Sequence, residues 1–582
     1  MMSPITGSAP DVDTGQGRGM VFGAHKVVRN PGTPSLRSER IFVRRLRREY
    51  AEVMSTPAGS DKPYSDTTAY GSGPTDSITD TTENTAITHH SVTLAGREIA
   101  YTAAAGHLVT VDPSSSRAAA KMFYVAFTED TPSTTDRPVT FFYNGGPGSS
   151  SVYVLLGSFA PMRLKTNMPS FTPAAPYTIE PNPDSLLDNS DLVFINPVGT
   201  GYSAAIAPHV NKDFWGVDQD AGSLCQFIKR YLTRYDRWNS PKFLFGESYG
   251  TARSCVLAYM LHEDGVDLNG VTLLSSILDY SQSGNPVGLL PTLCADAWYH
   301  KKIIVTPPPA DLPSFMKAVV PFAQNDYAKA LAAFPDAGPV TVQTLSNYTG
   351  ILPVVLISWE GLNVADTDNL GTLHFLTALL RADGKALGAY DGRVLAIDTG
   401  IAAALNPLSG SNDPTMTAVN GAYTAEWNSY LEDGLKFTST SSFTDLNDQA
   451  FANWDFGHID PTGAQKGKDV NGNIVLYTAG DLAAIMALNI DLKVLSANGY
   501  FDSVTPFSQT TTDLHNMPLT DATVRENLTI KYYPSGHMVY LDGNSRTALK
   551  ADLAALYDST VSDRPAVQRI LALQLASRTN RA

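Results

Sequence analysis

The segment KFLFGESYGTA, residues 242–252, decides the fold prediction. Its first part, Lys242–Phe245, is a short apolar run typical of a buried strand, and the stretch from Ala252 to Leu261 is typical of a helix. Between them lies a GxSxG motif, residues 246–250, in the strand–turn–helix setting of a nucleophile elbow. Its glycines permit a cramped turn that lifts a serine hydroxyl to the carboxyl end of a sheet. The segment therefore predicts an exposed, reactive serine at Ser248.

Short runs of the same kind lie on both sides of this segment. They occupy residues 139–142, 192–195, 271–274, 493–496 and 528–533. Such runs, bounded by Gly, Pro, Asn or Asp, fit buried strands of a parallel sheet. Helical patterns lie between them, as where Leu224, Phe227 and Ile228 share one helix face. Alternating strands and helices predict an α/β fold with a mostly parallel central sheet flanked by helices.

The texture of the chain predicts five regions. Residues 1–87 are rich in Gly, Pro, Ser, Thr and Asp, which predicts a disordered or weakly ordered tail carrying a basic patch at 37–48. Residues 88–280 and 481–560 carry the strand and helix patterns and predict the two parts of one core. Residues 281–480 lose that rhythm and predict a large cap insertion. Residues 561–582 predict a C-terminal tail.

Composition argues against several classes of function. The content of 43% hydrophobic and 17% charged residues is globular. The chain has 42 Lys and Arg against 57 Asp and Glu, a net charge of −15, which argues against a nucleic-acid partner. No apolar run is long enough to predict a membrane span.

The cysteines also restrict the prediction. Cys225, Cys255 and Cys294 are too few for a disulfide scaffold and lie at no zinc-ligand spacing. They predict free buried thiols, and we expect neither a metal nor a cofactor. The N-terminus shows no basic start followed by an apolar core, so no signal peptide is visible.

A nucleophilic serine needs a base, and the base needs an orienting group. In this architecture the acid and the histidine follow the serine in chain order. Asp502 lies in the loop after the 493–496 strand, and His537 lies on a turn after the 528–533 strand. His515 is the nearest competitor, but it does not directly follow a strand. The pattern therefore predicts a triad of Ser248, Asp502 and His537.

Backbone N–H groups must also face the negative charge that develops during acyl transfer. One is expected from Tyr249, the residue after the serine. The other is expected from the glycine-rich loop NGGPGSSS at 144–151, which follows the 139–142 strand. A phosphate-cradling role for this loop is the rival interpretation, but the Walker Lys-Ser/Thr is absent.

These segments together resemble the serine carboxypeptidases, peptidase family S10, which have the α/β-hydrolase fold. The resemblance rests on motifs that occur in the family's order: NGGPGSS at 144–150, PVGTGYS at 197–203, GESYG at 246–250, GYFD at 499–502 and GHM at 536–538. The strands before residue 142 and the segment 290–300 look most like bacterial members. The resemblance implies release of a C-terminal amino acid from peptides through an acyl-enzyme.

The resemblance also implies residue roles. Ser248 is expected to be the nucleophile, His537 the base and Asp502 its orienter. The oxyanion hole is expected from the N–H groups of Gly146 and Tyr249. The substrate site is expected from Asn144 and Glu247, which would hold the C-terminal carboxylate, with Gly145 and Met538.

The chain departs from the family pattern at two positions. Ser158 stands where a second glutamate normally helps to hold the carboxylate, and Ser149 stands where many members have a disulfide-forming cysteine. A lone Glu247 lacks the mutual rise in pKa of a carboxyl pair. With Arg253 or Asn144 compensating, we expect activity at neutral pH that extends higher than is usual for the family. Arg253 itself is expected in a buried structural ion pair.

Three functions remain open. The first is a serine carboxypeptidase acting on peptides with a free C-terminus. The second is an esterase or acyltransferase with the same triad, since one fold hosts many chemistries. The serine at position 158 in place of a glutamate favours this alternative. The third is a non-catalytic binding protein. The resemblance favours export or the periplasm, whereas the N-terminus favours the cytoplasm; side-chain preference and oligomeric state stay undetermined.

Overall fold

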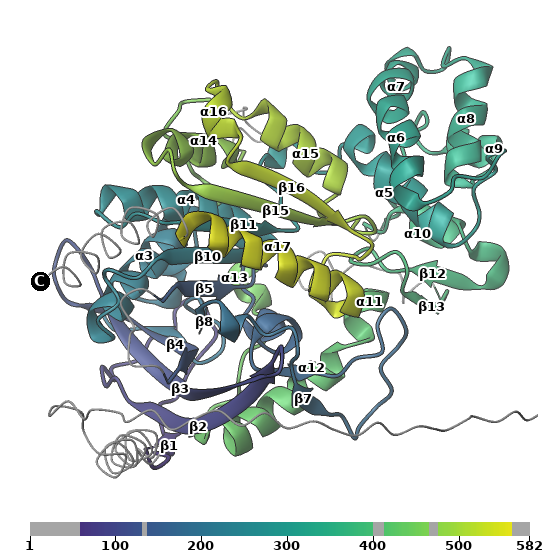
Figure 1. Cartoon of the computed structure of the whole chain (residues 1–582). Helices are drawn as coiled ribbons and strands as arrows, with labels where there is room; N and C mark the ends of the chain where they lie inside the picture. Colours follow the sequence, from purple (N-terminus) through teal and green to yellow (C-terminus); the bar gives the residue numbers. More distant parts are fainter. Residues whose placement is uncertain (1–58, 131–136, 370, 400–411, 465–474, 562–582) are drawn as a thin grey trace, which may run out of the picture. The chain divides into compact units, whose positions relative to one another are not determined.

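The computed structural model describes residues 59–130, 137–369, 371–399, 412–464 and 475–561. Within these residues the dominant element is a ten-stranded sheet with the strand order β16-β15-β11-β10-β5-β8-β4-β3-β2, and β9 pairs with β4 (Figure 1).

Six strands of this sheet run parallel to one another. They are β5 (Val139–Tyr143), β8 (Asp191–Ile195), β10 (Lys242–Glu247), β11 (Gly270–Leu274), β15 (Lys493–Gly499) and β16 (Leu528–Tyr533). The apolar runs thus predicted each end of these strands to within three residues.

The remaining strands add an antiparallel half. They are β2 (Thr85–Leu94), β3 (Arg97–Val111), β4 (Ala118–Glu129) and the short β9 (Ala204–Ala205). β2, β3 and β4 form an antiparallel meander that precedes the parallel strands in the chain.

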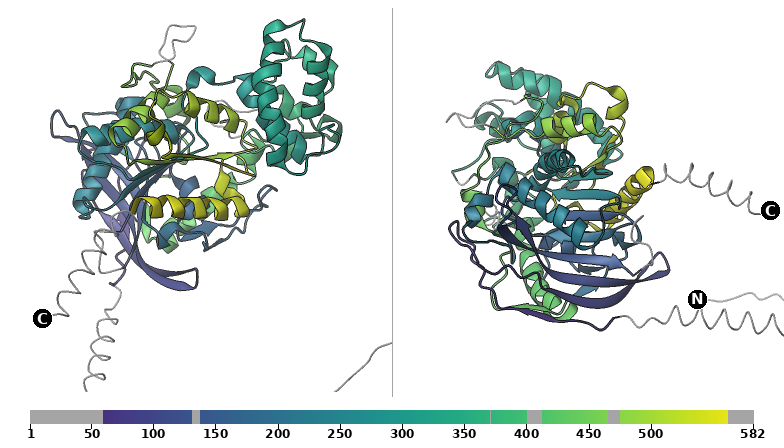
Figure 2. Two further views of the ribbon diagram at one scale, coloured as in Figure 1. Left: turned by 45° about the horizontal axis from the view of Figure 1, so that its top comes forward. Right: turned by 90° about the vertical axis from the view of Figure 1, so that its left-hand side faces the viewer.

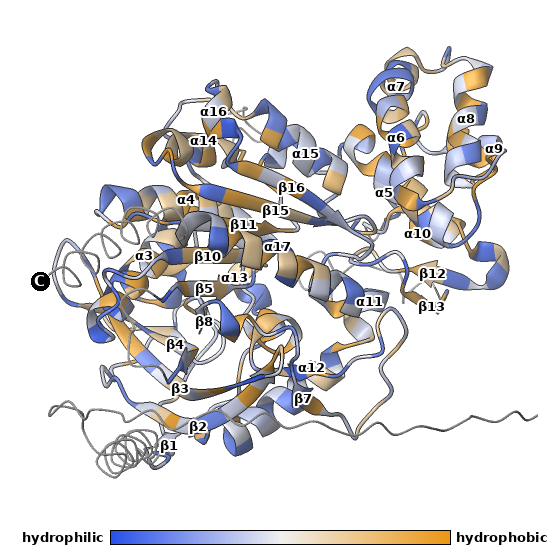
Figure 3. Cartoon of the chain, in the orientation of Figure 1, coloured by the Kyte–Doolittle hydropathy of each residue, from blue (hydrophilic) through white to orange (hydrophobic). Residues whose placement is uncertain are grey.

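Helices cover both faces of the sheet. One face packs against α3 (Val217–Arg234), α4 (Tyr249–Glu263) and α14 (Ala479–Leu488), and the other against α17 (Gly543–Val561) (Figure 2). Successive strand residues point to opposite faces, so Phe141 and Phe142 enter different cores. Figure 3 shows hydrophobic residues along the central strands, as burial on both faces requires. This is the α/β-hydrolase fold that the sequence predicted.

The segment between the two halves of the sheet is not one uniform region. Its first part contains the helices α5 (Pro286–Tyr299), α6 (Leu312–Phe322), α7 (Ala328–Ala333), α8 (Pro339–Thr349), α9 (Pro353–Ser358) and α10 (His374–Ala378), which gather beside the sheet around a core of their own (Figure 1). The sequence pattern, which loses its regular rhythm there, did not predict these helices, because several are short and begin at prolines.

The second part of that segment belongs to the main core instead. It contains α11 (Pro414–Thr417), α12 (Asn420–Ser429), β14 (Phe437–Ser439) and α13 (Asp448–Ala452). Tyr423, Trp427 and Phe437 are buried in the same cluster as the strand residues Phe142 and Phe245. These residues therefore belong to the main core, although they follow the helical insertion in the sequence.

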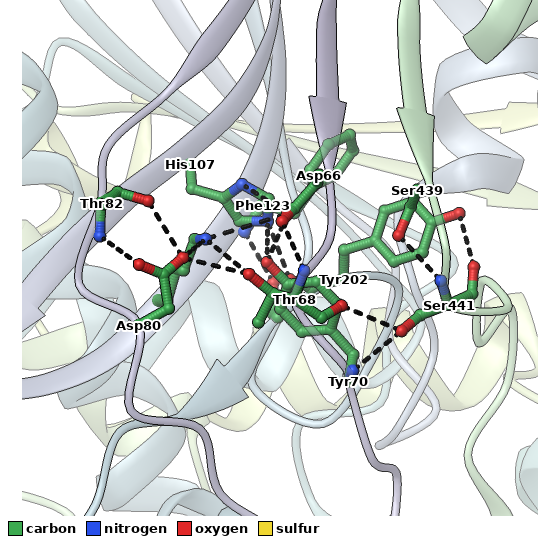
Figure 4. A network of polar contacts seen from close by, with 12 residues as sticks. Asp66, Thr68, Tyr70, Asp80, Thr82, His107, Phe123, Tyr202, Ser439 and Ser441 are labelled. Carbon is green, nitrogen blue, oxygen red and sulfur yellow. Dashed lines mark hydrogen bonds and ion pairs between the residues drawn. The ribbon is translucent and has the colours of Figure 1, made fainter.

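The predicted tail boundary at residue 87 is too late. Strand β1 (Tyr64–Asp66) pairs in parallel with β14, and residues 60–82 contact the sheet through buried polar groups (Figure 4). The Nζ atom of Lys121 on β4, itself fully buried, lies 2.5 Å from Asp80 and 3.8 Å from Asp66. Polar contacts and the burial of Ile78 against Ile206 order this segment, and so sparse an apolar pattern does not reveal it. The basic patch at 37–48 and residues 562–582 lie outside the described residues.

Cys225, Cys255 and Cys294 are free and buried, as predicted. Among the described residues, no helix is both long enough and apolar enough to cross a membrane.

Candidate active site

Ser248 occupies a strained turn between β10 and α4. Its φ of 60° and ψ of −129° lie outside the regions that L-residues favour. The turn needs glycine at position 246, because a Cβ there would lie 2.1 Å from the Gly250 carbonyl oxygen. The strain holds the serine side chain at the carboxyl end of the sheet, as the GxSxG motif predicted.

The glycine-rich loop after β5 lies directly against this turn. A Cβ at Gly145 would meet the backbone nitrogen of Tyr249 at 2.5 Å, so only glycine permits the approach. Gly146 has a φ of 104°, which also favours glycine. Tyr249 is the first residue of α4, where an N–H has no partner within its own helix. The two segments predicted to supply an oxyanion hole are therefore adjacent.

Asp502 and His537 form a buried pair. The Nδ1 atom of His537 lies 2.8 Å from Oδ2 of Asp502. Asp502 also accepts hydrogen bonds at Oδ1 from the N–H groups of Val504 and Thr505, at 2.9 and 3.0 Å. Burial disfavours a charge on His537, but the carboxylate of Asp502 outweighs that effect and raises the pKa of the imidazole. The aspartate thus orients the ring and favours its charged form.

Thr505 is a member of this arrangement that the sequence reading missed. Its hydroxyl donates to Oδ2 of Asp502 at 2.5 Å and lies 3.2 Å from Nδ1 of His537. The only signal in the sequence is a threonine three residues after the aspartate, a spacing that allows a side-chain turn.

A cavity of about 490 Å³ opens at this end of the sheet. Its lining includes eight of the nine residues predicted for the site: Asn144, Gly145, Gly146, Glu247, Ser248, Tyr249, His537 and Met538. Asp502, the ninth, is fully buried behind His537 and does not line it. Elements far apart in the sequence therefore converge on one concave surface, where binding sites are usual.

Glu247 is buried beside Ser248, within hydrogen-bond reach of Asn144. The Nδ2 group of Asn144 donates to Oε2 of Glu247 at 3.0 Å, and Oδ1 of Asn144 accepts from the N–H of Val154 at 3.0 Å. Burial raises the pKa of Glu247 to about 7, although His537 and the hydrogen bonds act in the opposite direction. The carboxyl is thus close to half-protonated at neutral pH.

A tyrosine is the second donor to the same oxygen. The hydroxyl of Tyr540, in the short turn η8 (Val539–Leu541), donates to Oε2 of Glu247 at 2.7 Å. Ser158, by contrast, is fully buried in η1 (Leu155–Phe159), and its hydroxyl donates to the Val154 carbonyl. A Cβ at Gly157 would lie 2.6 Å from the Tyr540 ring, so this ring packs on the turn that carries Ser158. The phenol rather than Ser158 therefore interacts with Glu247.

Arg253 has the structural role that the sequence predicted. Its guanidinium is fully buried, pairs with Asp220 at 2.5 Å and donates to the Asn144 carbonyl at 2.6 Å. It lies over the rings of Tyr143 and Tyr249. These contacts fix the loop after β5 and the start of α4, and they leave Arg253 outside the cavity lining.

No cluster of three or more His, Cys, Asp or Glu side chains suited to a metal ion occurs among the described residues. The chemistry that these side chains support together is nucleophilic acyl transfer, because a strained serine, the histidine of a buried His–Asp pair and two adjacent glycine-containing segments line one cavity.

Comparison with known proteins gives a consistent result. Residues 97–301 match the family model for serine carboxypeptidases. A human probable serine carboxypeptidase, CPVL, is 31% identical over 148 residues, 24% of this chain and 28% of that protein. The mouse lysosomal protective protein is 26% identical over 183 residues, 31% of this chain and 35% of that protein. The matched region thus spans only about a third of these relatives.

Solved structures extend the comparison. The Kex1 prohormone-processing carboxypeptidase of Saccharomyces cerevisiae is 16% identical, with a TM-score of 0.46 over 79% of this chain and 91% of that one. A proline iminopeptidase of Mycobacterium smegmatis is 12% identical, with a TM-score of 0.32 over 78% of this chain and 99% of that one.

Proposed function

We propose that this chain, whose residues 97–301 match the serine carboxypeptidase family model, removes C-terminal amino acids from peptides by hydrolysis. The observation that carries the proposal is the placement of Glu247, a largely protonated carboxyl in mildly acidic solution, beside Ser248 in the same cavity. A protonated carboxyl donates a hydrogen bond to a substrate carboxylate, which an internal peptide bond does not offer.

The first half of the reaction forms the acyl-enzyme. Ser248 attacks the last peptide carbonyl while Nε2 of His537 takes its proton, and Asp502 stabilises the imidazolium through Nδ1. The N–H groups of Gly146 and Tyr249 face the oxygen on which negative charge develops. His537 then returns the proton to the leaving amine.

The second half releases the acyl group. Water enters after the C-terminal amino acid has left, and His537 takes a proton from it as it attacks the ester carbonyl. The bond to Ser248 breaks, and His537 returns the proton to the serine oxygen. No cofactor takes part in either half.

Recognition of the free C-terminus falls to Asn144 and Glu247. The amide of Asn144 is already oriented by Val154, and Oε2 of Glu247 is engaged by two donors. Oε1 of Glu247 is therefore the atom proposed to meet the substrate carboxylate, with Met538 and Gly145 packed around the leaving residue.

The test compares an N-blocked dipeptide with its C-terminal amide. We expect the free acid to be cleaved at least about a hundredfold faster, because the site would be built around a carboxylate. Ser248→Ala should abolish both reactions. Equal cleavage of acid and amide would overturn the exopeptidase proposal, and no labelling of Ser248 by a fluorophosphonate would favour a non-catalytic binding protein.

An esterase or acyltransferase is the second candidate. Ser158 favours it, since the second carboxyl expected for peptide exopeptidases is replaced by a hydroxyl that does not line the cavity. Turnover of p-nitrophenyl esters without release of amino acids from blocked dipeptides would support this candidate over the first.

A further inference from the structure

The cavity beside Ser248 contains a second pair of carboxyl groups that the proposed reaction does not use. Asp279 and Asp513 both line it, together with Gln282 and Gln509. The same four residues also line an adjoining cavity of about 180 Å³, large enough for several water molecules. The acidic pair therefore stands where the main cavity meets a smaller chamber.

The carboxyl group of Asp513 is buried, and only one of its two oxygens has a hydrogen-bond donor among the described residues. Its side chain lies in α15 (Phe507–Asn516) and the residue is 5% exposed. Gln509 donates to Oδ1 of Asp513 at 2.7 Å, but Oδ2 accepts no hydrogen bond from the described residues. A buried acceptor without a donor is costly, so this atom is open to a hydrogen-bond donor that enters the cavity.

No Lys, Arg or His of the described residues pairs with the carboxyl groups of Asp279 and Asp513. Asp279 accepts only from its own turn, through the N–H and hydroxyl of Ser281. Two neighbouring carboxyl groups thus face one chamber with unused acceptor capacity.

The order of strands places this pair on one side of the nucleophile. Ser248 follows β10, Asn144 follows β5, and Asp279 follows β11. Asp513 lies in the helix after β15, the next strand beyond β11. Since the strand order is β15-β11-β10-β5, the acidic pair and the proposed carboxylate site with Asn144 lie on opposite sides of Ser248.

We propose that Asp279 and Asp513 form a subsite for a basic side chain, lysine or arginine, on the residue that donates its carbonyl to Ser248. The proposal rests on the proposed function, because it takes the leaving residue to occupy the side of Asn144 and Glu247. The acyl side of the substrate then extends toward β11 and β15. An ammonium or guanidinium group supplies the donors that Oδ2 of Asp513 lacks.

Charge at this subsite depends on pH. Burial raises the pKa of Asp513 to about 7, with Asp279 acting in the same direction and Gln509 and the backbone of Leu278 and Asp279 opposing. The phenol of Tyr477, which lines the chamber from the segment before α14, has a pKa raised to about 12 by burial and stays neutral. A basic side chain therefore meets more negative charge above pH 7 than below it.

The test uses two diphenyl phosphonates, one of N-blocked lysine and one of N-blocked norleucine, which is similar in length and uncharged. Ser248 attacks phosphorus and phenoxide leaves, so labelling reports the acyl side without a C-terminal carboxylate. We expect the lysine probe to label Ser248 at least about tenfold faster at pH 8, the size expected of a hydrogen bond to a charged group. The ratio should fall as the pH is lowered to about 6.

Variants separate the subsite from general effects. Asp513→Asn should bring the ratio of labelling rates close to one, and Asp279→Asn should lower it independently. Asp267→Asn, at an exposed turn before β11, should keep the wild-type ratio. Equal rates in the wild type, or an unchanged ratio in both cavity variants, would overturn the subsite. Absence of labelling by either probe would overturn the proposed function and the subsite with it.

Discussion

The Tyr540 hydroxyl donates a hydrogen bond of 2.7 Å to Oε2 of Glu247, and Asn144 donates to the same oxygen at 3.0 Å. Both donors stabilise the charged form of a carboxyl that is otherwise buried, and burial still raises its pKa to about 7. A single carboxyl with two neutral donors thus has a proton to give near neutral pH, without the second carboxyl that the family resemblance led us to expect.

Replacing Tyr540 by phenylalanine should shift the ionisation of Glu247 to higher pH. The hydrogen bond favours the carboxylate, so its loss should raise the pKa of Glu247 by about one unit. If a protonated Glu247 holds the substrate, kcat/KM for a blocked dipeptide at about pH 8 should rise relative to that at pH 6.

Tyr557→Phe is the matched control for this change. Tyr557 is a buried tyrosine of α17 that does not line the cavity, and its hydroxyl contacts Thr140 at 2.8 Å. It should change stability without moving the pH profile. If kcat/KM falls at the same alkaline pH in Tyr540→Phe as in the wild type, Glu247 is not the group whose ionisation causes that fall.

The wild-type enzyme should have a bell-shaped profile of kcat/KM with its maximum near neutral pH. Below the raised pKa of His537 the imidazole is protonated and accepts no proton from Ser248, so activity is lost in acid. Above about pH 7 Glu247 ionises and repels the substrate carboxylate. Because the two groups interact, the two apparent pKa values belong to the pair.

A substrate without a C-terminal carboxylate distinguishes the two limbs. The corresponding blocked amino-acid ester should keep the acid limb and lose the alkaline one, since it has no charge for Glu247 to repel. An alkaline limb of equal depth with both substrates would contradict the assignment to Glu247.

Thr505→Val should lower kcat by about tenfold, the typical effect of losing one hydrogen bond to a charged group. Its hydroxyl donates to Oδ2 of Asp502, the oxygen that faces His537. It does not contact the proposed carboxylate site, so KM should change little. Thr505→Ser should restore most of kcat, which a merely steric role of the threonine methyl group does not predict.

Sequence reasoning located the strands because their signals are local, and it placed the residues proposed for the triad in the turns that follow them. The apolar runs before Asn144 and Ser248 are buried on both faces, and the order of Ser248, Asp502 and His537 follows from the topology of the sheet. Tyr540, by contrast, reaches Glu247 only because η8 packs against η1, a tertiary contact that no periodicity encodes. Ser158 showed that the second carboxyl group is absent from the sequence. It did not show that the Tyr540 hydroxyl interacts with Glu247 instead.

The N-terminal boundary failed for a different reason. Residues 60–82 have the polar composition of a tail, and they are ordered by partners distant in the chain. The hydroxyl of Tyr70 lies 3.1 Å from Nε2 of His107, and Lys121 pairs with Asp80. Composition indicates how much apolar surface a segment can bury. It does not indicate that a buried lysine elsewhere in the chain, Lys121, pairs with carboxylates of the segment.

Lys121→Met should therefore destabilise the protein by about 3–5 kcal/mol, because it leaves Asp66 buried without its cation. Guanidinium unfolding measures this change. Lys531→Met, which removes a half-exposed pair with Asp552, should cost less than about 1 kcal/mol and serves as the control.

The effect of Lys121→Met should also depend on pH with a definite sign. Burial opposes the charge on Asp80, but the hydrogen bond and charge of Lys121 outweigh it and lower the pKa below its ordinary value of 3.8. A carboxyl whose pKa is lowered by folding stabilises the protein above that ordinary value and loses the contribution as the pH falls through the folded pKa. The difference between Lys121→Met and wild type should thus be full at neutral pH and shrink below about pH 4. A difference that persists unchanged in acid would mean that packing of the lysine stem, rather than its charge, attaches residues 60–82 to the sheet.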